Sequence, residues 1–291
     1  MNIALTGSSG LIGSHILSDL KNMGHNVLCI SSSESCPEEN IFLYEELQSS
    51  TIKFKAQFLI HLATVNSSLQ ESEIPLEIDL IKKAINSMEI LNCKNFIFFS
   101  TIKVYGDNSF GFNIFDEECP KNPSCFYGKA KSQCEEILMN SAIEINFNYL
   151  ILRLPPILIN HPKSNLGKLF KLVERGFPIP SFRVGDSNRR SFLSYHLLVC
   201  FMKEVFIIKE LSSNNILNLS DKDPISTNDL LKRFGKTINK NPRIIYLPHL
   251  LFKAMIRVNR LQFALCKLFG NFHISTSKVR DVYKLQNIFD K

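Results

Sequence analysis

The stretch TGSSGLIG, residues 6–13, decides the fold of this 291-residue chain. It follows a short apolar run, residues 2–6, whose length and composition predict a buried strand. It also opens residues 10–23, in which apolar side chains recur at helical spacing. Three glycines between a strand and a helix at the start of a chain predict a dinucleotide-binding turn, with a tight turn that binds no ligand as the alternative.

Each glycine of this stretch has its own expected task. Gly7 would permit the tight turn, Gly10 would let the backbone approach a pyrophosphate, and Gly13 would let helix and strand pack closely. The start of the helix would then face the phosphates with N–H groups that have no partner within the helix and with its positive dipole end. The glycines therefore predict a phosphate cradle.

The rest of the first half alternates between strand-like and helix-like segments. Residues 75–91 carry an amphipathic helical pattern, and a further helix is expected to begin near Tyr127. The other runs are short and apolar, and they predict strands at residues 25–30, 58–63, 95–100 and 147–152. This alternation predicts an α/β fold with a Rossmann-type, doubly wound parallel sheet.

Beyond about residue 155 the rhythm changes, because five prolines between residues 155 and 180 divide the chain into short pieces. A strand-like run at residues 215–219 and helical patterns from Ser226 and at residues 248–258 follow. We therefore expect a dinucleotide-binding domain at 1–155 and a smaller substrate-binding lobe at 156–291, interleaved with the sheet.

Composition restricts the class of protein. Hydrophobic residues make up 45% and charged residues 21%, as in ordinary globular proteins. No apolar run reaches the 18 or so residues of a membrane span, and the N-terminus lacks the basic region of a signal peptide. The eight cysteines form no CxxC pair and no zinc-ligand spacing. We expect a cytoplasmic protein without a membrane span, disulfides or a metal.

The formal net charge of +7 is compatible with a phosphorylated substrate or with a solvated surface. The lysines and arginines are scattered, without a run of five or more, so no nucleic-acid partner is expected.

Tyr127 and Lys131 are four residues apart and so share one face of the expected helix. A phenol is a poor acid or base near neutrality because its reference pKa is about 10, but a neighbouring ammonium stabilises the phenolate. Thr101 follows a buried strand at the edge where doubly wound sheets bind ligands, and its hydroxyl could bond to a substrate oxygen. Ser100 is the alternative hydroxyl.

These motifs, in this order and spacing, resemble the extended short-chain dehydrogenase/reductases, specifically the NAD-dependent epimerase/dehydratase family. They are TGSSGLIG at 6–13, HLAT at 61–64, STIKVYG at 100–106, YGKAK at 127–131 and RLPP at 153–156. The resemblance implies a catalytic triad of Thr101, Tyr127 and Lys131. The full set of expected cofactor contacts is Gly7, Ser9, Gly10, Leu11, Ile12, Gly13, Ser31, Leu62, Ala63, Ser100, Tyr127, Lys131 and Pro155.

The end of the second strand bears on the choice between NADP(H) and NAD(H). In NAD-specific sites an acidic residue there binds the ribose hydroxyls. Here the strand runs into three serines, residues 31–33, and Ser31 would not repel a 2′-phosphate. The sequence therefore favours NADP(H), with NAD(H) as the alternative.

The C-terminal half is similar to bacterial UDP-4-keto-sugar reductases in ERGFPIP at 174–180 and NRRSF at 188–192. The resemblance implies that Asn165 and Arg190 contact the diphosphate of a UDP-sugar and that Pro180 lies in the uridine-binding stretch. It also allows a homodimer.

The leading hypothesis is that the chain reduces the C4 keto group of a UDP-linked sugar, as those proteins do in O-antigen or capsule synthesis. The first alternative is a UDP-sugar 4-epimerase with tightly bound NAD. The second, of another class, is a non-catalytic regulator that binds NAD(P).

Overall fold

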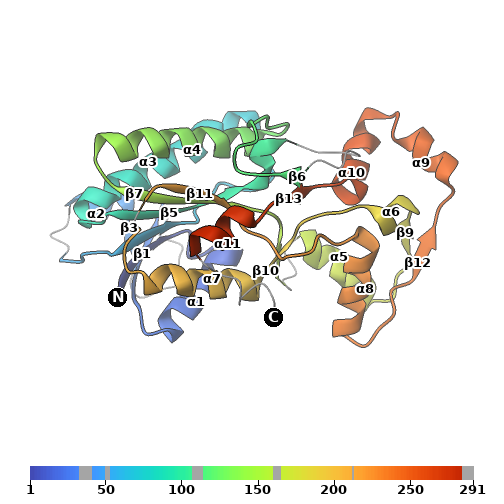
Figure 1. Ribbon diagram of the computed structural model, residues 1–291, viewed down its shortest axis with the longest axis horizontal. Coiled ribbons are helices and arrows are strands. Elements are labelled where there is room, and N and C mark those ends of the chain that lie inside the picture. Colours follow the sequence, from blue (N-terminus) through green and yellow to red (C-terminus); the bar gives the residue numbers. More distant parts are fainter. Residues whose placement is uncertain (33–40, 50–52, 107–113, 160–164, 212, 284–291) are drawn as a thin grey trace.

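A parallel sheet of seven strands forms the centre of the computed structural model, which describes residues 1–32, 41–49, 53–106, 114–159, 165–211 and 213–283 (Figure 1). The strands are β1 (Asn2–Thr6), β2 (Asn26–Ser31), β3 (Ile41–Leu43), β4 (Phe58–His61), β5 (Asn95–Thr101), β7 (Asn148–Leu154) and β11 (Asn215–Asn218). Their order is β3-β2-β1-β4-β5-β7-β11, and every pairing is parallel. The predicted Rossmann-type, doubly wound parallel sheet is confirmed.

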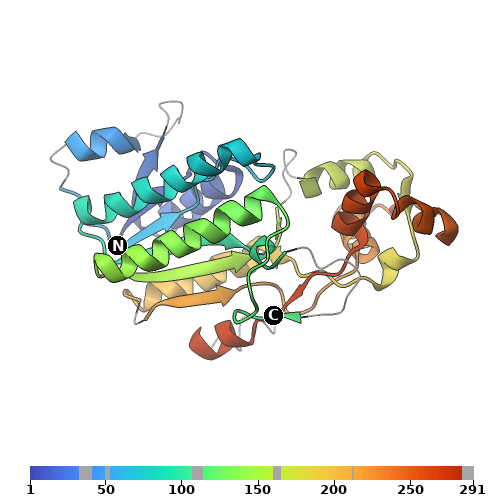
Figure 2. The ribbon, with the colours of Figure 1, turned by 90° about the horizontal axis from the view of Figure 1, so that it is seen from above.

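Helices cover both faces of this sheet (Figures 1 and 2). On one side lie α1 (Leu11–Asn22), α7 (Tyr195–Ile207) and α11 (Ser277–Tyr283), and on the other α2 (Tyr44–Ser49), α3 (Ile74–Ile90) and α4 (Phe126–Glu144). Strands enclosed in this way bury both of their faces and read as continuous apolar runs. β5, with the sequence NFIFFST, is buried along its whole length.

A smaller lobe extends from the carboxyl edge of the sheet (Figure 2). Its helices are α5 (Asn165–Glu174), α6 (Val184–Ser187), α8 (Thr227–Thr237), α9 (His249–Met255) and α10 (Asn259–Phe269). Short parallel strand pairs link distant segments: β6 (Ile114–Phe115) with β13 (His273–Ile274), β8 (Ile157–Leu158) with β10 (Leu193–Ser194), and β9 (Ile179–Ser181) with β12 (Ile244–Tyr246). Two short 3₁₀ helices, η1 (Glu71–Glu73) and η2 (Ile102–Tyr105), precede α3 and follow β5.

The chain returns to the sheet after residue 155, because α7, β11 and α11 all pack there. The division into 1–155 and 156–291 stays a prediction. Sequence analysis did not anticipate α7, whose sequence YHLLVCFMKEVFI is so uniformly apolar that its helical period is weak. In the described part of the chain, no helix is long and apolar enough to cross a membrane.

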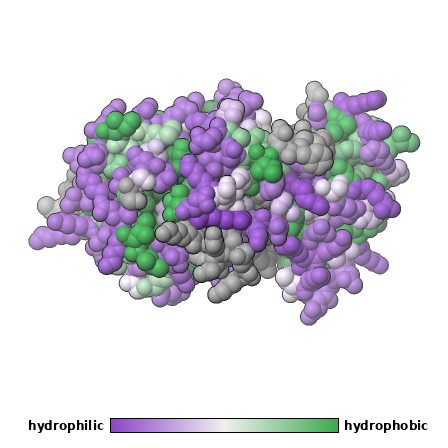
Figure 3. All heavy atoms as spheres, in the orientation of Figure 1, coloured by the Kyte–Doolittle hydropathy of each residue, from purple (hydrophilic) through white to green (hydrophobic). Residues whose placement is uncertain are grey.

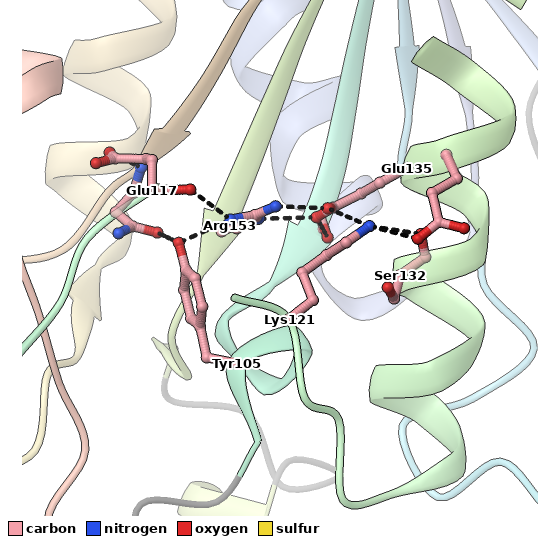
Figure 4. A network of polar contacts seen from close by, with 9 residues as sticks. Tyr105, Glu117, Lys121, Ser132, Glu135 and Arg153 are labelled. Carbon is pink, nitrogen blue, oxygen red and sulfur yellow. Dashed lines mark hydrogen bonds and ion pairs between the residues drawn. The ribbon is translucent and has the colours of Figure 1, made fainter. Parts of the chain in front are cut away.

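A buried ion pair joins β7 to α4 (Figure 4). Arg153 donates from Nη2 to Glu135 Oε2 (2.8 Å) and from Nε to Glu135 Oε1 (3.1 Å). The side chains of Arg153 and Glu135 are 4% and 0% exposed. Two parallel hydrogen bonds of this kind hold the guanidinium and the carboxylate in one relative orientation, in addition to pairing their charges.

Further bonds extend from this pair into neighbouring elements. Arg153 Nη1 donates to the Tyr105 hydroxyl (3.0 Å), which donates to Asn218 Oδ1 (2.8 Å) in β11. Ser100 Oγ, at the end of β5, donates to Glu135 Oε1 (2.6 Å). One charged pair therefore connects β5, β7, β11, η2 and α4.

Glu135→Gln should lower the free energy of unfolding by about 3–5 kcal/mol, because it leaves the Arg153 charge buried without a counter-charge. Urea denaturation measures this loss. Glu136→Gln is the matched control: the neighbouring carboxylate is exposed where it pairs with Lys121, and its loss should cost less than about 1 kcal/mol. Equal losses in the two variants would contradict the assigned role of Glu135.

Candidate active site at the carboxyl edge of the sheet

The loops that follow β1 and β4 touch at the carboxyl edge of the sheet. Gly7 has a φ of +74°, and a Cβ added to it would lie 2.5 Å from the Ala63 nitrogen. The Ala63 N–H donates to Thr6 Oγ1 (3.3 Å), and the Leu62 N–H donates to the Thr6 carbonyl (3.2 Å). Only glycine combines this backbone conformation with such a close neighbour.

The next two glycines shape the start of α1. A Cβ at Gly13 would collide with the Gly7 carbonyl oxygen, so helix and turn can pack this closely only without a side chain. At Gly10 a Cβ would meet only the Gly7 carbonyl oxygen, at 3.2 Å, and the remaining space is open. The first turn of α1 carries no acidic residue. An open glycine turn under a helix N-terminus fits the pyrophosphate of a dinucleotide.

The other expected cofactor residues lie along the same edge, because parallel strands all end there. Ser31 is the last residue of β2, Thr101 the last of β5, and Pro155 directly follows β7. Ser9 is exposed in the glycine turn, and Leu11 and Ile12 are half-buried in the first turn of α1. Their contacts with a cofactor stay predictions.

Tyr127 lies in the first turn of α4, with two ammonium groups near its ring. Lys131 Nζ is 5.9 Å from the centre of its ring, and Lys103 Nζ, from η2, is 5.7 Å away. Gly128 allows this approach, because a Cβ there would lie 2.5 Å from the Lys103 carbonyl oxygen. Burial raises the pKa of Tyr127, the Lys131 charge lowers it, and the Glu77 charge raises it. The pKa of Tyr127 is raised as a result. Sequence analysis missed Lys103 as a neighbour of the tyrosine.

The two hydroxyls at the end of β5 have different partners. Ser100 is tied to Glu135 in the buried network, whereas Thr101 Oγ1 accepts from the Lys103 N–H (3.3 Å) and caps η2. Neighbouring strand residues point to opposite faces. The geometry thus favours Thr101 over Ser100 as the hydroxyl that is available to a substrate.

Lys131 forms a buried ion pair with Glu77 of α3. Nζ lies 3.0 Å from Glu77 Oε1, and the two side chains are 2% and 1% exposed. Burial alone would lower the pKa of Lys131. The negative partners Glu77 and Tyr127 more than compensate for this effect, so the pKa of Lys131 is raised. Lys131 is also one of the expected cofactor contacts; in the structure Nζ pairs with Glu77, and its contact with a cofactor stays a prediction.

Glu77 also organises the loop that follows β4. Its Oε2 accepts from Thr64 Oγ1 (3.0 Å) and from the Val65 N–H (2.8 Å). Sequence analysis did not single out Glu77. The signal was there: Glu77 stands four residues before Ile81 and so belongs to the buried stripe of α3. A carboxylate on an apolar stripe needs a buried partner.

The expected substrate residues belong to the smaller lobe. Arg190 Nη1 donates to the Gly270 (2.7 Å) and Cys266 (3.3 Å) carbonyls at the end of α10. Pro180 is exposed in β9. Asn165 is the first residue of α5, and its side chain lies outside the described part of the structure.

Comparison with known proteins agrees with this geometry. The sequence model described as "NAD dependent epimerase/dehydratase family" matches residues 3–190, which is more than half of the chain. The chain belongs to this family. It is therefore an NAD-dependent enzyme of the extended short-chain dehydrogenase/reductase type, as the resemblance predicted.

Individual members of the family are similar along nearly the whole chain. UDP-glucose 4-epimerase from Vibrio cholerae is 24% identical, over 96% of this chain and 89% of that protein. UDP-glucose 4-epimerase from Thermotoga maritima, solved with UDP-glucose, has a TM-score of 0.74 at 20% identity, covering 97% and 92% of the two chains. UDP-glucuronic acid 4-epimerase from Bacillus cereus, solved with NAD, has a TM-score of 0.72 at 17% identity, covering 97% and 92%.

These findings support NAD(H) as the cofactor, since the family is defined by NAD dependence and the Bacillus cereus structure contains NAD. They give no support to the preference for NADP(H) that was drawn from Ser31. The missing acid at the end of β2 was a weak signal because it removes one contact to the ribose without supplying a positive partner for a 2′-phosphate.

Glu77→Gln should destabilise the protein by about 3–5 kcal/mol near neutral pH, because the Lys131 ammonium loses its buried counter-charge. The pKa of Lys131 should then fall below its unfolded value of about 10.4, so the variant should regain stability as the pH rises towards that value. Urea denaturation between pH 7 and 10 measures both effects. Asp79→Asn, which breaks an exposed pair on the same helix, is the control and should be nearly neutral. A variant whose deficit is unchanged at high pH would contradict the pairing.

We expect the protein to lose stability in mild acid because of His61. Its ring is buried, Nδ1 lies 2.8 Å from Thr6 Oγ1, and burial followed by the Lys131 charge lowers its pKa well below 6.5. The unfolded chain therefore takes up a proton near pH 6.5 that the folded chain does not, and the free energy of unfolding falls as the pH drops below that value. Denaturation at pH 7.5 and 5.5 checks this. The decrease should be smaller in His61→Gln; an equal decrease would assign it to other groups.

Proposed function

We propose that this enzyme interconverts UDP-sugars that are epimers at C4, with NAD as its cofactor. The observation that carries the proposal is the placement of Tyr127: it stands at the carboxyl edge, flanked by Lys131 and Lys103, on the helix that follows Thr101 and η2. The 4-epimerase activity named for each of the relatives above supports the choice of reaction.

Each side chain would have a defined task. Thr101 would donate to the sugar O4 and orient it, and Tyr127 would take the O4 proton and later return it. The two ammonium groups would stabilise the phenolate that this exchange requires. The glycine turn of residues 7–13 would hold NAD, whose chemistry would be reversible hydride exchange with C4. Return of the hydride to the opposite face of the sugar gives the epimer, so the reaction needs no net oxidant.

The substrate assignment rests on the smaller lobe. The Thermotoga maritima relative was solved with UDP-glucose, and the Arg190 guanidinium is held at the C-terminal end of α10, from which it could bind a diphosphate. Asn165 and Pro180 would add contacts to the diphosphate and the uridine. A homodimer stays a prediction.

Reduction of a UDP-4-keto sugar is the second candidate, and the similarity of residues 174–180 and 188–192 to keto-sugar reductases favours it. The same triad would serve, with Tyr127 donating its proton to the new alkoxide. The named relatives support the epimerase alternative more than this reduction. Family membership speaks against the third hypothesis, a non-catalytic regulator.

Two assays separate the leading candidates. An epimerase should convert UDP-glucose to UDP-galactose, or the corresponding N-acetylated pair, without consuming added NADH, and should be purified with NAD bound. Stoichiometric oxidation of NADH by a UDP-4-keto sugar, with no epimerisation of any UDP-sugar tested, would replace this proposal with the reductase.

Tyr127→Phe should lower kcat by about 10²–10⁴-fold, the usual contribution of general acid–base catalysis, while NAD binding stays nearly unchanged. Steady-state turnover and a fluorescence titration with NADH measure the two quantities. Tyr149→Phe, at the amino end of β7 and so at the edge of the sheet opposite the site, is the matched control and should keep full activity. Turnover of Tyr127→Phe close to that of the parent enzyme would rule out this tyrosine as the proton carrier.

A further inference from the structure

One part of the chain carries an unusual charge. Residues 230–280 contain eleven lysines and arginines and no aspartate or glutamate. The whole chain has 34 basic and 27 acidic residues, so the other 240 residues carry 23 and 27 and are slightly acidic. The segment therefore carries a formal charge of +11 and the rest of the chain −4, so the net positive charge of the protein comes entirely from residues 230–280.

The same segment also exposes apolar side chains. Leu250 and Leu251 in α9 are 79% and 42% exposed, and Val258, Leu261 and Leu268, at the start of α10 and within it, are 51%, 39% and 46% exposed. Lys253 and Arg257 are exposed among them. Leucines beside cations, with no acid in the segment, are the composition of a helix that lies in the headgroup region of a membrane.

Buried side chains attach α9 and α10 to the rest of the lobe. Phe252 of α9 and Leu265 and Phe269 of α10 are buried against Phe182, which follows β9. The exposed leucines therefore belong to an anchored surface of the lobe. Figures 1 and 2 place α9 at the end of the long axis away from the sheet and α10 beside it on the side towards the sheet, and Figure 3 shows apolar patches among polar atoms in this part of the lobe.

The positive charge of this surface and its exposed apolar side chains together indicate which kind of partner it binds. A second copy of the chain would bring two α9–α10 surfaces face to face, each with four cations and no acidic residue in residues 249–269, which is repulsive. A nucleic acid would match the charge but would gain little from the exposed leucines, because its outer surface is phosphate. An anionic bilayer offers phosphates for the cations and an acyl boundary for the leucines.

We propose that α9 and α10 form a peripheral docking surface for an anionic lipid bilayer. Leu250, Leu251 and Val258 enter the headgroup region, and Lys253 and Arg257 contact lipid phosphates. With 7 and 11 residues, the two helices are too short to span a bilayer and lie along its surface. The interaction would hold the smaller lobe, and with it the expected sugar site, next to the membrane.

The test is co-sedimentation of the full chain with vesicles. We expect binding to an equal mixture of phosphatidylglycerol and phosphatidylcholine, no binding to phosphatidylcholine alone, and weaker binding as the salt concentration rises. Leu250→Glu/Leu251→Glu should weaken binding by more than about tenfold. Lys253→Glu/Arg257→Glu should weaken it by at least about twenty-five-fold, since each cation near such a surface is worth roughly fivefold.

The matched control is Ile143→Glu/Ile145→Glu, at the end of α4, where the two side chains are 81% and 46% exposed. This pair should bind vesicles like the parent protein. Circular dichroism and NADH titration verify that every variant is folded. Three results would each overturn the proposal: no binding to the anionic vesicles, equal losses in the control and α9 variants, or binding to duplex DNA that is tighter than vesicle binding and insensitive to Leu250→Glu/Leu251→Glu.

Discussion

The ion pair between Arg153 and Glu135 sets the position of α4, and the candidate site depends on that position. Glu135 stands four residues after Lys131, which stands four after Tyr127, so the three side chains form a row along one face of the helix. One end of the row is bonded to β7, and through Ser100 to β5, in a region closed to water. The other end reaches the carboxyl edge of the sheet. The expected reacting group is thus held by the same face that anchors the helix.

A second buried pair, Lys131 with Glu77, lies between α3 and α4, so α4 carries one buried cation and one buried anion, each neutralised by another element. Transfer of four charges out of water is costly unless each finds a partner in the right geometry. Displacement of α4 would separate both pairs at once. This arrangement also governs Tyr127, because Glu77 offsets the help that Lys131 gives to its ionisation.

Sequence reasoning found the parts of the fold that local patterns encode. The glycine turn, the apolar run of β5 and the amphipathic α3 all have signatures within a few residues, and the structure contains them. It missed α7, whose uniform apolarity hides its period. For the site it proposed Thr101, Tyr127 and Lys131, whose roles stay predictions, but it did not find Glu77 or Lys103 as their neighbours. A carboxylate on the apolar stripe of α3 indicates a buried partner for Glu77 but does not identify Lys131. That identity and the approach of Lys103 to Tyr127 arise from packing between elements that are distant in sequence.

The late return of the chain to the sheet has a consequence for synthesis. When residue 155 has left the ribosome, the sheet face that α7 covers is still bare, and the outer edge of β7 has no neighbour until β11 appears. The strands β6 and β13 can pair only later still, after residue 274 has been made. The nascent first half therefore exposes an apolar sheet face and an unpaired strand edge. Intermediates of this kind are prone to aggregate or to bind chaperones. Folding of this protein is completed only after nearly the whole chain has been made.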